Sequence, residues 1–312
     1  MVNSSALTPC LSEPRGLTDN RCDMPFRATR SARPAPRWSP SAFLRWSAAL
    51  HAGAAAGALA VPGWWPAWLA LVAGNHLVLS TVGLLPRSGL LGANLTRLPA
   101  AAAARGEVAL TFDDGPNPDV TPRVLDMLDA VGARATFFCV GEAVQRHPAL
   151  AREIVRRGHL IENHTASHPN AFAAYGWGGM TRQVAEGQRL IRQVTGRTPR
   201  FFRAVAGLRN PLLDPILTRQ NLRLAAWTRR GFDTRCPSPA LVLRRLTRNL
   251  AAGDILLLHD GHAACTGRGD PVVLVVLPHL LAQLRARGLH SVTLAAACDT
   301  SAELTTLAGA TA

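Results

Sequence analysis

The alternation of hydrophobic and polar positions changes character near residue 107. From there on, short apolar runs rich in β-branched and aromatic residues are separated by longer segments with the spacing of amphipathic helices. Apolar runs of that kind, bounded by turn residues, predict buried strands. The expected strands are residues 107–112, 134–140, 159–162, 200–204, 222–227, 254–258 and 289–294.

Helical spacing fills the gaps between these strands. Seven strands that alternate with helices predict an α/β domain, residues 107–297, with a largely parallel sheet that is open or closed into a barrel. Ligands in such folds gather beyond the carboxyl ends of the strands, so the residues at those ends are the first candidates for chemistry. The clearest helical segments are residues 119–131, 142–157, 180–195, 238–251 and 272–287.

The first hundred residues have a different pattern. Residues 1–40 are rich in Pro, Ser and Arg without apolar periodicity, which predicts a disordered tail. Two apolar runs follow at 42–61 and 64–85, and their lengths of 20 and 22 residues are close to the ~20 needed to cross a bilayer. The sequence PGWWP between them suits a turn at the membrane interface. We therefore expect two transmembrane helices, paired as a hairpin, at residues 41–86.

Small and polar residues inside the two apolar runs indicate how the helices would pack. Gly53 and Gly57 form a GxxxG face that lets a second helix approach closely. Asn75 and His76 are costly in lipid, so we expect them to face the partner helix. The alternative for the first run is an Ala-rich soluble or interfacial helix.

Composition narrows the function classes. The formal net charge is +14 and every basic side chain is Arg, but no Arg-rich block is interleaved with aromatic residues, so nucleic acid is not an expected partner. The six cysteines show no CxxC spacing and predict neither a zinc knuckle nor a disulfide framework. Cys139 lies in the apolar run ATFFCV and is expected to be a small core residue.

The stretch VALTFDDGPNP, residues 108–118, places two carboxylates at the end of an expected core strand. Gly115 and Pro116 end that strand directly after Asp113 and Asp114. Two adjacent like charges are costly unless a positive group shares the site. The alternative is a strand that ends in a solvated turn, where Asp is common.

Other strand ends carry complementary side chains. His164 and His168 are four residues apart, which on a helical turn puts both imidazoles on one face. Two histidines and one carboxylate make a three-ligand metal site with an open position. Arg203, Asp233 and His259 follow later strands. Carboxylates, imidazoles and a guanidinium that converge on one rim are what a metal-assisted hydrolase needs.

The stretches TFDDGP, HTASHP, FFRAVAG, RGFDT and LLLHDG occur in the order seen in polysaccharide deacetylases, the NodB-homology hydrolases of carbohydrate esterase family 4. The chain resembles this family over residues 107–295. The resemblance implies a distorted (β/α) barrel of seven strands and one divalent metal ion, usually Zn²⁺. It also implies a reaction, hydrolysis of an N-acyl group, typically acetyl, from an amino-sugar substrate.

The resemblance carries roles to positions of this sequence. Asp113 resembles the general base, and Asp114, His164 and His168 resemble the metal ligands. Arg203 would orient the base. The base would take a proton as water attacks an acyl carbonyl that the metal polarises.

The remaining roles concern the leaving group and the acyl pocket. His259, steadied by Asp233, would be the general acid that protonates the departing amine. A backbone N–H near Ala206 would help to stabilise the oxyanion, and Leu257 would line the acyl pocket. Val205 and Ala206 stand where the family usually has Pro and an aromatic residue, and no Trp follows Asp233. Fewer sugar-stacking aromatics favour a lipid-linked or glycolipid amino sugar over a polymer as the substrate.

Two rival functions remain open. A phosphatase with a nucleophilic Asp would need DxD after the strand, whereas the aspartates here are adjacent. A catalytically inactive, membrane-anchored glycan-binding or scaffold protein is disfavoured because all the expected catalytic side chains are present. Arg229 and Arg230 are read as solvated, although an anionic substrate head group could use them. The histidines outside the cluster are read as structural or surface residues: His147, His159, His262, His279 and His290.

Charged flanks predict the membrane topology. Basic flanks stay in the cytoplasm, so two spans in a bacterial inner membrane would leave the catalytic domain inside the cell, and a single span would place it in the periplasm. A linker at 87–106 and a tail at 298–312 complete the expected organisation, and Met24 would serve as a start as well as Met1 does. The flanking arginines are Arg15, Arg21, Arg27, Arg30, Arg33 and Arg37 before the first run, and Arg87, Arg97 and Arg105 after the second.

Overall fold

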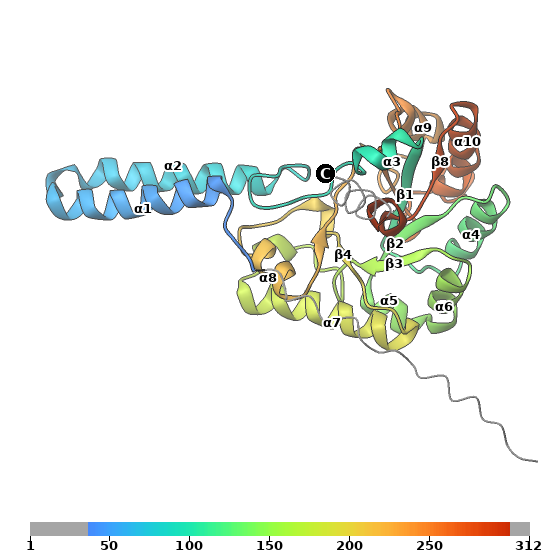
Figure 1. The fold of residues 1–312 in the computed structure, drawn as a ribbon, viewed down its shortest axis with the longest axis horizontal. Coiled ribbons are helices and arrows are strands. Elements are labelled where there is room, and N and C mark those ends of the chain that lie inside the picture. The colour runs from blue at the N-terminus through green and yellow to red at the C-terminus, as the bar shows by residue number, and fades with distance from the viewer. Residues whose placement is uncertain (1–36, 300–312) are drawn as a thin grey trace, which may run out of the picture. The chain divides into compact units, whose positions relative to one another are not determined.

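A curled, all-parallel sheet forms the main domain of the computed structural model, which describes residues 37–299 (Figure 1). The strand order is β5-β4-β3-β2-β1-β7-β6, and β8 pairs with β1. The α/β barrel expected from the sequence is therefore confirmed, as a half-barrel. The strands are β1 (Glu107–Asp113), β2 (Ala135–Cys139), β3 (Leu160–Asn163), β4 (Phe201–Phe202), β5 (Arg223–Leu224), β6 (Arg229–Arg230), β7 (Ile255–His259) and β8 (His290–Ser291).

Helices cover the outer face of this sheet, and Figure 1 shows α4, α6, α7 and α10 around its rim. The expected helix at 142–157 is two helices, because Pro148 begins a new one after a break at His147. The helices are α3 (Ala100–Ala104), α4 (Thr121–Asp129), α5 (Gly141–Arg146), α6 (Pro148–Arg156), α7 (Trp177–Thr195), α8 (Leu213–Arg219), α9 (Pro239–Thr247) and α10 (Val272–Ala286), with 3₁₀ turns η2 (Phe172–Ala174) and η3 (Val205–Gly207).

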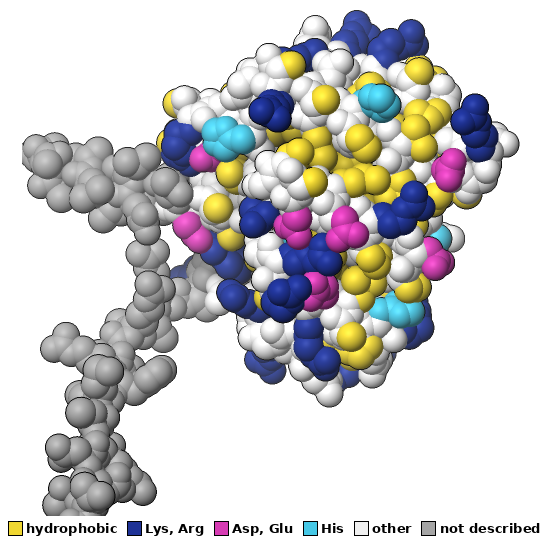
Figure 2. Space-filling view, turned by 90° about the vertical axis from the view of Figure 1, so that its right-hand side faces the viewer, with side chains coloured by type: hydrophobic (Ala, Val, Ile, Leu, Met, Phe, Trp, Pro, Cys, Tyr) yellow, Lys and Arg dark blue, Asp and Glu magenta, His cyan; other side chains and the backbone are white. Residues whose placement is uncertain are grey.

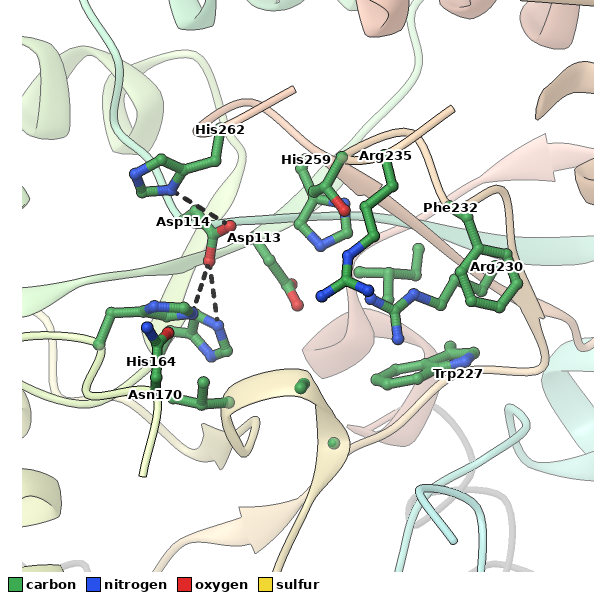
Figure 3. A pocket seen from close by; sticks show the side chains of 16 residues that line it. Asp113, Asp114, His164, Asn170, Trp227, Arg230, Phe232, Arg235, His259 and His262 are labelled. Atoms are coloured by element: carbon green, nitrogen blue, oxygen red, sulfur yellow. Dashed lines mark ion pairs between the residues drawn. The ribbon is translucent and has the colours of Figure 1, made fainter. Parts of the chain in front are cut away.

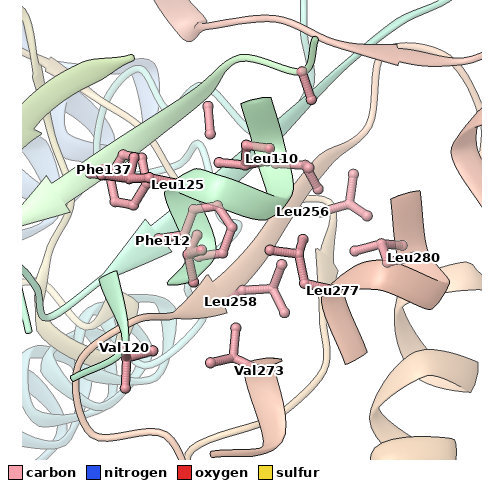
Figure 4. Close-up of a cluster of buried hydrophobic side chains, with 14 of the residues drawn as sticks. Leu110, Phe112, Val120, Leu125, Phe137, Leu256, Leu258, Val273, Leu277 and Leu280 are labelled. Carbon is pink, nitrogen blue, oxygen red and sulfur yellow. The ribbon is translucent and has the colours of Figure 1, made fainter. Parts of the chain in front are cut away.

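Alternate residues of the central strands face opposite sides of the sheet. Leu110 and Phe112 of β1 point outward into the core shared with α4 and α10 (Figure 4), where they are fully buried. Ala109 of β1 and Leu257 of β7 belong instead to a second cluster inside the curl of the sheet. Because side chains alternate along β1, Asp113 at the end of this strand also points toward the inside.

The expected linker fills the gap between the two edges of the sheet. Leu95 forms a parallel bridge with Ala225, which follows β5, and Arg97 forms an antiparallel bridge with Asp254, which precedes β7. Leu98 is 6% exposed and packs in the inner cluster. Residues 95–98 thus supply backbone partners that the short edge strands leave unpaired.

Charged side chains are mixed on the face drawn in Figure 2, where basic and acidic groups are interspersed. Arg157, at the end of α6, pairs with Asp126 of α4 at 2.6 Å and with Glu153 at 2.7 Å. Exposed ion pairs of this kind each contribute little to stability.

The two N-terminal apolar runs form α1 (Ala42–Ala60) and α2 (Trp65–Gly83), joined by the 3₁₀ turn η1 (Pro62–Trp64) and packed side by side (Figure 1). Among the described residues, only the helical segment Pro62–Gly83 is long and apolar enough to span a membrane. The expectation of two spans is therefore supported for the second run and not for the first.

Polar groups of the hairpin face each other, as expected for Asn75 and His76. Asn75 donates to Ser47 Oγ at 2.8 Å, and the Nε2 atoms of His51 and His76 are 3.3 Å apart. Gly57 gives room to the partner helix, because a Cβ there would meet the Trp68 ring at 2.5 Å.

Gly53 plays no such part, since a Cβ at that position would meet nothing within 4 Å. The expected GxxxG face is therefore half correct. The close approach of the two helices is made at Gly57 through an aromatic side chain of α2.

Candidate active site

The carboxyl ends of β1 and β7 place two of the expected catalytic side chains opposite each other. Asp113 is the register partner of His259, and both face the inside of the sheet. Next to this pair, Asn163 of β3 is the register partner of Phe202 of β4, so the residues that follow, His164 and Arg203, also meet. Parallel pairing alone thus gathers four side chains from four strands at one rim.

Arg203 is completely buried and fully hydrogen-bonded. Its Nη1 donates to Asp113 Oδ1 at 2.7 Å and to Thr111 Oγ1 at 2.8 Å. The remaining guanidinium nitrogens donate to the backbone carbonyls that follow β5, and the guanidinium carbon lies 4.0 Å from the centre of the Phe138 ring. A charge buried this way fixes the orientation of the Asp113 carboxylate.

Asp114, His164 and His168 offer three ligand atoms within 4.8 Å of one another, which makes them a candidate metal centre. The Nε2 atoms of the histidines lie 3.2 and 3.1 Å from Asp114 Oδ1, yet that buried oxygen has no hydrogen-bond partner. His164 Nδ1 contacts the Arg203 carbonyl at 2.8 Å, which leaves its Nε2 lone pair directed at the cluster. Three convergent N and O donors without hydrogen bonds to one another fit a divalent cation.

The surrounding charges favour the ionised carboxylate of Asp114, which is the form that binds a metal ion. Burial would raise the pKa of its carboxyl, but His164, His168 and His262 outweigh burial and hold this pKa well below its usual range. Burial would lower the pKa of His164, whereas Asp113 and Asp114 raise it above the usual value. A bound cation would take the place of that proton.

His259 is held by Asp233 through two contacts. Its backbone N–H donates to Asp233 Oδ2 at 2.8 Å, and its Nδ1 lies 2.9 Å from Asp233 Oδ1. Burial would lower the pKa of His259, but the charge and hydrogen bond of Asp233 raise it above the usual value. The tautomer with a proton on Nδ1 leaves Nε2 free to face the pocket.

These groups surround a pocket of about 760 Å³ (Figure 3). Of the expected site residues, Arg203 and Asp233 lie behind the wall, where they support Asp113 and His259. Those that line it are Asp113, Asp114, His164, His168, Ala206, Leu257 and His259.

Several further lining residues were not anticipated as site residues from the sequence, among them Asn170, Trp227, Phe232, Arg235 and His262. His262 is exposed, as its reading as a surface residue implies, but its Nδ1 is 3.5 Å from Asp114 Oδ2, beside the metal-ligand cluster. Its position three residues after His259 was the available signal. Trp227 and Phe232 also supply the aromatic surface that the motifs were expected to lack.

Arg229 and Arg230, which were read as solvated, differ in their surroundings. Arg229 pairs with Asp254 at 2.8 Å and donates to backbone carbonyls, so it is structural. Arg230 lines the pocket.

Backbone strain concentrates around the pocket. Among the described residues, five non-glycine residues that line it have φ between 53° and 75°: Asp114, His168, Ala206, Phe232 and His262. L-residues rarely adopt this conformation, and it persists where the surrounding structure holds it in place. Gly261 allows the turn after β7 to approach closely, since a Cβ there would lie 2.5 Å from the Asp114 carbonyl oxygen.

Comparison with known proteins identifies the family. A family model described as polysaccharide deacetylase matches residues 101–225. A peptidoglycan-N-acetylglucosamine deacetylase of Bacillus cereus is 33% identical over 204 residues, which cover 64% of this chain and 70% of that protein. The chain belongs to the polysaccharide deacetylase family. A chitooligosaccharide deacetylase of Sinorhizobium fredii is 37% identical over 177 residues, covering 54% of this chain and 78% of that one.

Solved structures of polysaccharide deacetylases share the fold. A peptidoglycan N-acetylglucosamine deacetylase superposes with a TM-score of 0.59 at 28% identity, covering 66% of this chain and 92% of its own. A pseudoenzyme of the same esterase family from Bacillus anthracis superposes with a TM-score of 0.57 at 24% identity, covering 64% and 66%. Because a pseudoenzyme has this fold, activity has to be argued from the side chains of the site.

Proposed function

We propose that this deacetylase hydrolyses the N-acetyl group of an amino sugar with the help of one divalent metal ion, Zn²⁺, held by Asp114, His164 and His168. The observation that carries the proposal is the pairing of Asp113 with His259 across one pocket, beside three convergent metal-ligand atoms. The relatives named above act on glycans that contain N-acetylated sugars, which supports the same substrate class here.

Asp113 is the proposed general base. When bound, the cation would polarise the acyl carbonyl and acidify the attacking water. Asp113 Oδ1 is occupied by Arg203 at 2.7 Å, so the other carboxylate oxygen accepts the proton from that water. Arg203 keeps the carboxylate in one orientation.

His259 is the proposed general acid. Asp233 holds the proton on Nδ1, so Nε2 donates its proton to the amine as the C–N bond breaks. Leu257, which is 1% exposed at the floor of the pocket, would contact the acyl methyl group, and the backbone N–H of Ala206 would donate to the oxyanion.

The rival proposal is an inactive glycan-binding or scaffold protein. The full-length chain, purified in detergent and loaded with Zn²⁺, is incubated with an N-acetylglucosamine oligosaccharide while acetate release and zinc content are measured. We expect acetate release that requires stoichiometric zinc. Zinc-loaded, folded protein that releases no acetate from this or any other N-acetylated sugar would favour the rival.

We further propose that α2 anchors the enzyme in the bacterial inner membrane with α1 packed against it, close to a lipid-linked or glycolipid substrate. Several large apolar side chains of the hairpin face outward, among them Trp46 at 76% exposed and Leu77 at 69%. Two inserted helices would leave the catalytic domain in the cytoplasm. A reporter that is active only in the periplasm, fused after Ala312, should therefore stay silent, and a strong signal would mean that α2 alone crosses.

A further inference from the structure

Arg230 is a cation without an anionic partner at the wall of the active-site pocket. It is the last residue of β6 and the register partner of Leu257. Its guanidinium carbon lies 5.2 Å from the centre of the Trp227 ring and 4.9 Å from that of the Phe232 ring. Its Nε is buried and has no hydrogen-bond partner, and no carboxylate among the described residues pairs with its side chain. A buried donor left unpaired is costly, and an acceptor on a ligand in the pocket would satisfy it.

Arg235 adds a second cation to the same wall. Figure 3 shows both guanidinium groups directed toward the middle of the pocket, between Trp227 and His259. Arg235 is exposed and has no carboxylate partner within the described part of the chain. Each of the two like charges disfavours the charged form of the other, and a bound anion would relieve that repulsion.

Asp113, Asp114 and Asp233 favour the charged form of Arg230 through space, but the contacts of each carboxylate are with other groups. Asp113 is neutralised by Arg203 at 2.7 Å, and Asp233 is bound to His259. Asp114 faces the histidine cluster. Each acidic group therefore has its own cationic or imidazole partner, and Arg230 and Arg235 are surplus positive charge in a pocket that would also hold a metal ion.

We propose that Arg230 and Arg235 bind an anionic group of the substrate, so that the preferred substrate is an N-acetylated amino sugar bearing a phosphate close to the amide. The inference rests on the proposed deacetylase function and specifies its substrate class. Guanidinium groups suit this task because their planar donors match a phosphate with two hydrogen bonds. The Trp227 and Phe232 rings contact the Arg230 guanidinium and restrict its motion, which lowers the entropy lost on binding.

The test compares three N-acetylglucosamine substrates with the zinc-loaded, full-length enzyme in detergent: a neutral disaccharide, the free sugar 1-phosphate, and the same sugar phosphate esterified to a long alkyl chain. We expect kcat/KM to be higher for at least one phosphate substrate than for the disaccharide. Arg230→Gln and Arg235→Gln should each lower kcat/KM for the phosphate substrates roughly 10- to 100-fold, mainly through KM. The loss of kcat/KM for the neutral disaccharide should be several-fold smaller than the loss for the phosphate substrates in the same variants.

Two matched variants control the experiment. Arg192→Gln removes one charge from an exposed position on α7 and should leave all three substrates unaffected. Arg230→Lys keeps the charge and should restore part of the lost kcat/KM. Because Arg235 is exposed, Arg235→Gln should fold even if Arg230→Gln does not, and a thermal melt checks this.

The outcomes separate the two proposals. The inference is supported if kcat/KM is higher for a phosphate substrate and the arginine variants lose this advantage. Whether the free phosphate or the alkyl phosphate is preferred then shows whether the anion comes from a soluble or a lipid-linked sugar. Equal kcat/KM for all three substrates, or equal losses on the neutral and phosphate substrates in the arginine variants, would overturn it while the deacetylase function stands. No acetate from any substrate would instead overturn the proposed function.

Discussion

The helical hairpin and the half-barrel use polar residues in opposite ways. In the hairpin, Asn75 and His76 meet polar groups of the partner helix, while large apolar side chains lie outside. In the half-barrel, the apolar side chains are inside and the polar groups converge on an open pocket. Polar residues that satisfy one another hold a structure together, whereas polar residues that converge without satisfying one another mark a binding site.

The largest effect expected from this contrast is at the three convergent ligand atoms. His168→Ala should remove most of the bound zinc and all measurable acetate release, because three ligands leave no redundancy. Zinc content is measured by mass spectrometry on purified protein. His279→Ala, a change at an exposed histidine of α10, should leave both quantities unchanged. Full zinc occupancy in the His168→Ala protein would rule out the metal site.

The next effect separates the proposed base from the adjacent ligand. Asp113→Asn should keep the zinc and lower kcat by ~10²–10⁴, the range typical of a lost general base. Asp119→Asn, at an exposed carboxylate in the same loop, should be neutral. Loss of zinc in Asp113→Asn would mean that the roles of Asp113 and Asp114 are exchanged.

The sequence predicted the strand ends better than it predicted the pocket. β1 and β7 are apolar runs, and their last residues, Asp113 and His259, are groups that the motifs indicated. β6 was missed because Arg229 and Arg230 are charged and only two residues pair. α8 was missed because its sequence LDPILTR contains a proline and no helical period of useful length.

Residues of the pocket wall depend on pairing register, which periodicity does not give. Arg230 reaches the pocket because it lies opposite Leu257, and Phe232 reaches it through a backbone with φ 63°. Neither fact can be read from local composition. His262 was within reach of sequence reasoning, since it follows His259 by three residues in one tight turn.

A third prediction concerns the pH dependence of the proposed acid. His259 acts when protonated, so kcat/KM should fall as pH rises through its pKa. Burial lowers that pKa, but Asp233 above all, helped by Asp113 and Asp114, raises it above the usual value, which places the loss at higher pH. Asp233→Asn should move this alkaline limb to lower pH.

The expected cost of Asp233→Asn is about tenfold in kcat/KM at neutral pH, with a smaller difference in acid, where His259 is protonated in both proteins. The full pH profile of kcat/KM distinguishes this from a general structural loss, which would lower activity at every pH by the same factor. An unchanged alkaline limb would show that Asp233 does not tune His259.

A fourth and smaller effect tests how α7 supports the metal-binding loop. A Cβ on Gly187 would lie 2.6 Å from Asn163 Oδ1 and 2.8 Å from the Thr165 carbonyl, in the loop between the two histidine ligands. Gly187→Ala should therefore destabilise the fold by about 1–3 kcal/mol and weaken zinc affinity. Gly178→Ala on the same helix meets nothing within 4 Å and should not destabilise. Equal melting temperatures for the two variants would contradict this packing.

The smallest effect on turnover is expected in the hairpin, and it tests the contrast between the two regions most directly. Asn75→Leu removes the hydrogen bond to Ser47, which should cost about 0.6–2 kcal/mol of helix packing and leave kcat/KM within about twofold. Leu77→Arg, on the exposed side of the same helix, places a charge where lipid is expected, at a cost of about 3 kcal/mol.

Leu77→Arg should therefore lower the share of protein that sediments with membranes after an alkaline carbonate wash, while Asn75→Leu should leave that share unchanged. If both proteins remained equally membrane-bound, or if both were equally soluble, the outward apolar surface would have another purpose than contact with lipid. Turnover measured in detergent should be the same for both variants, because no residue of the hairpin lines the pocket.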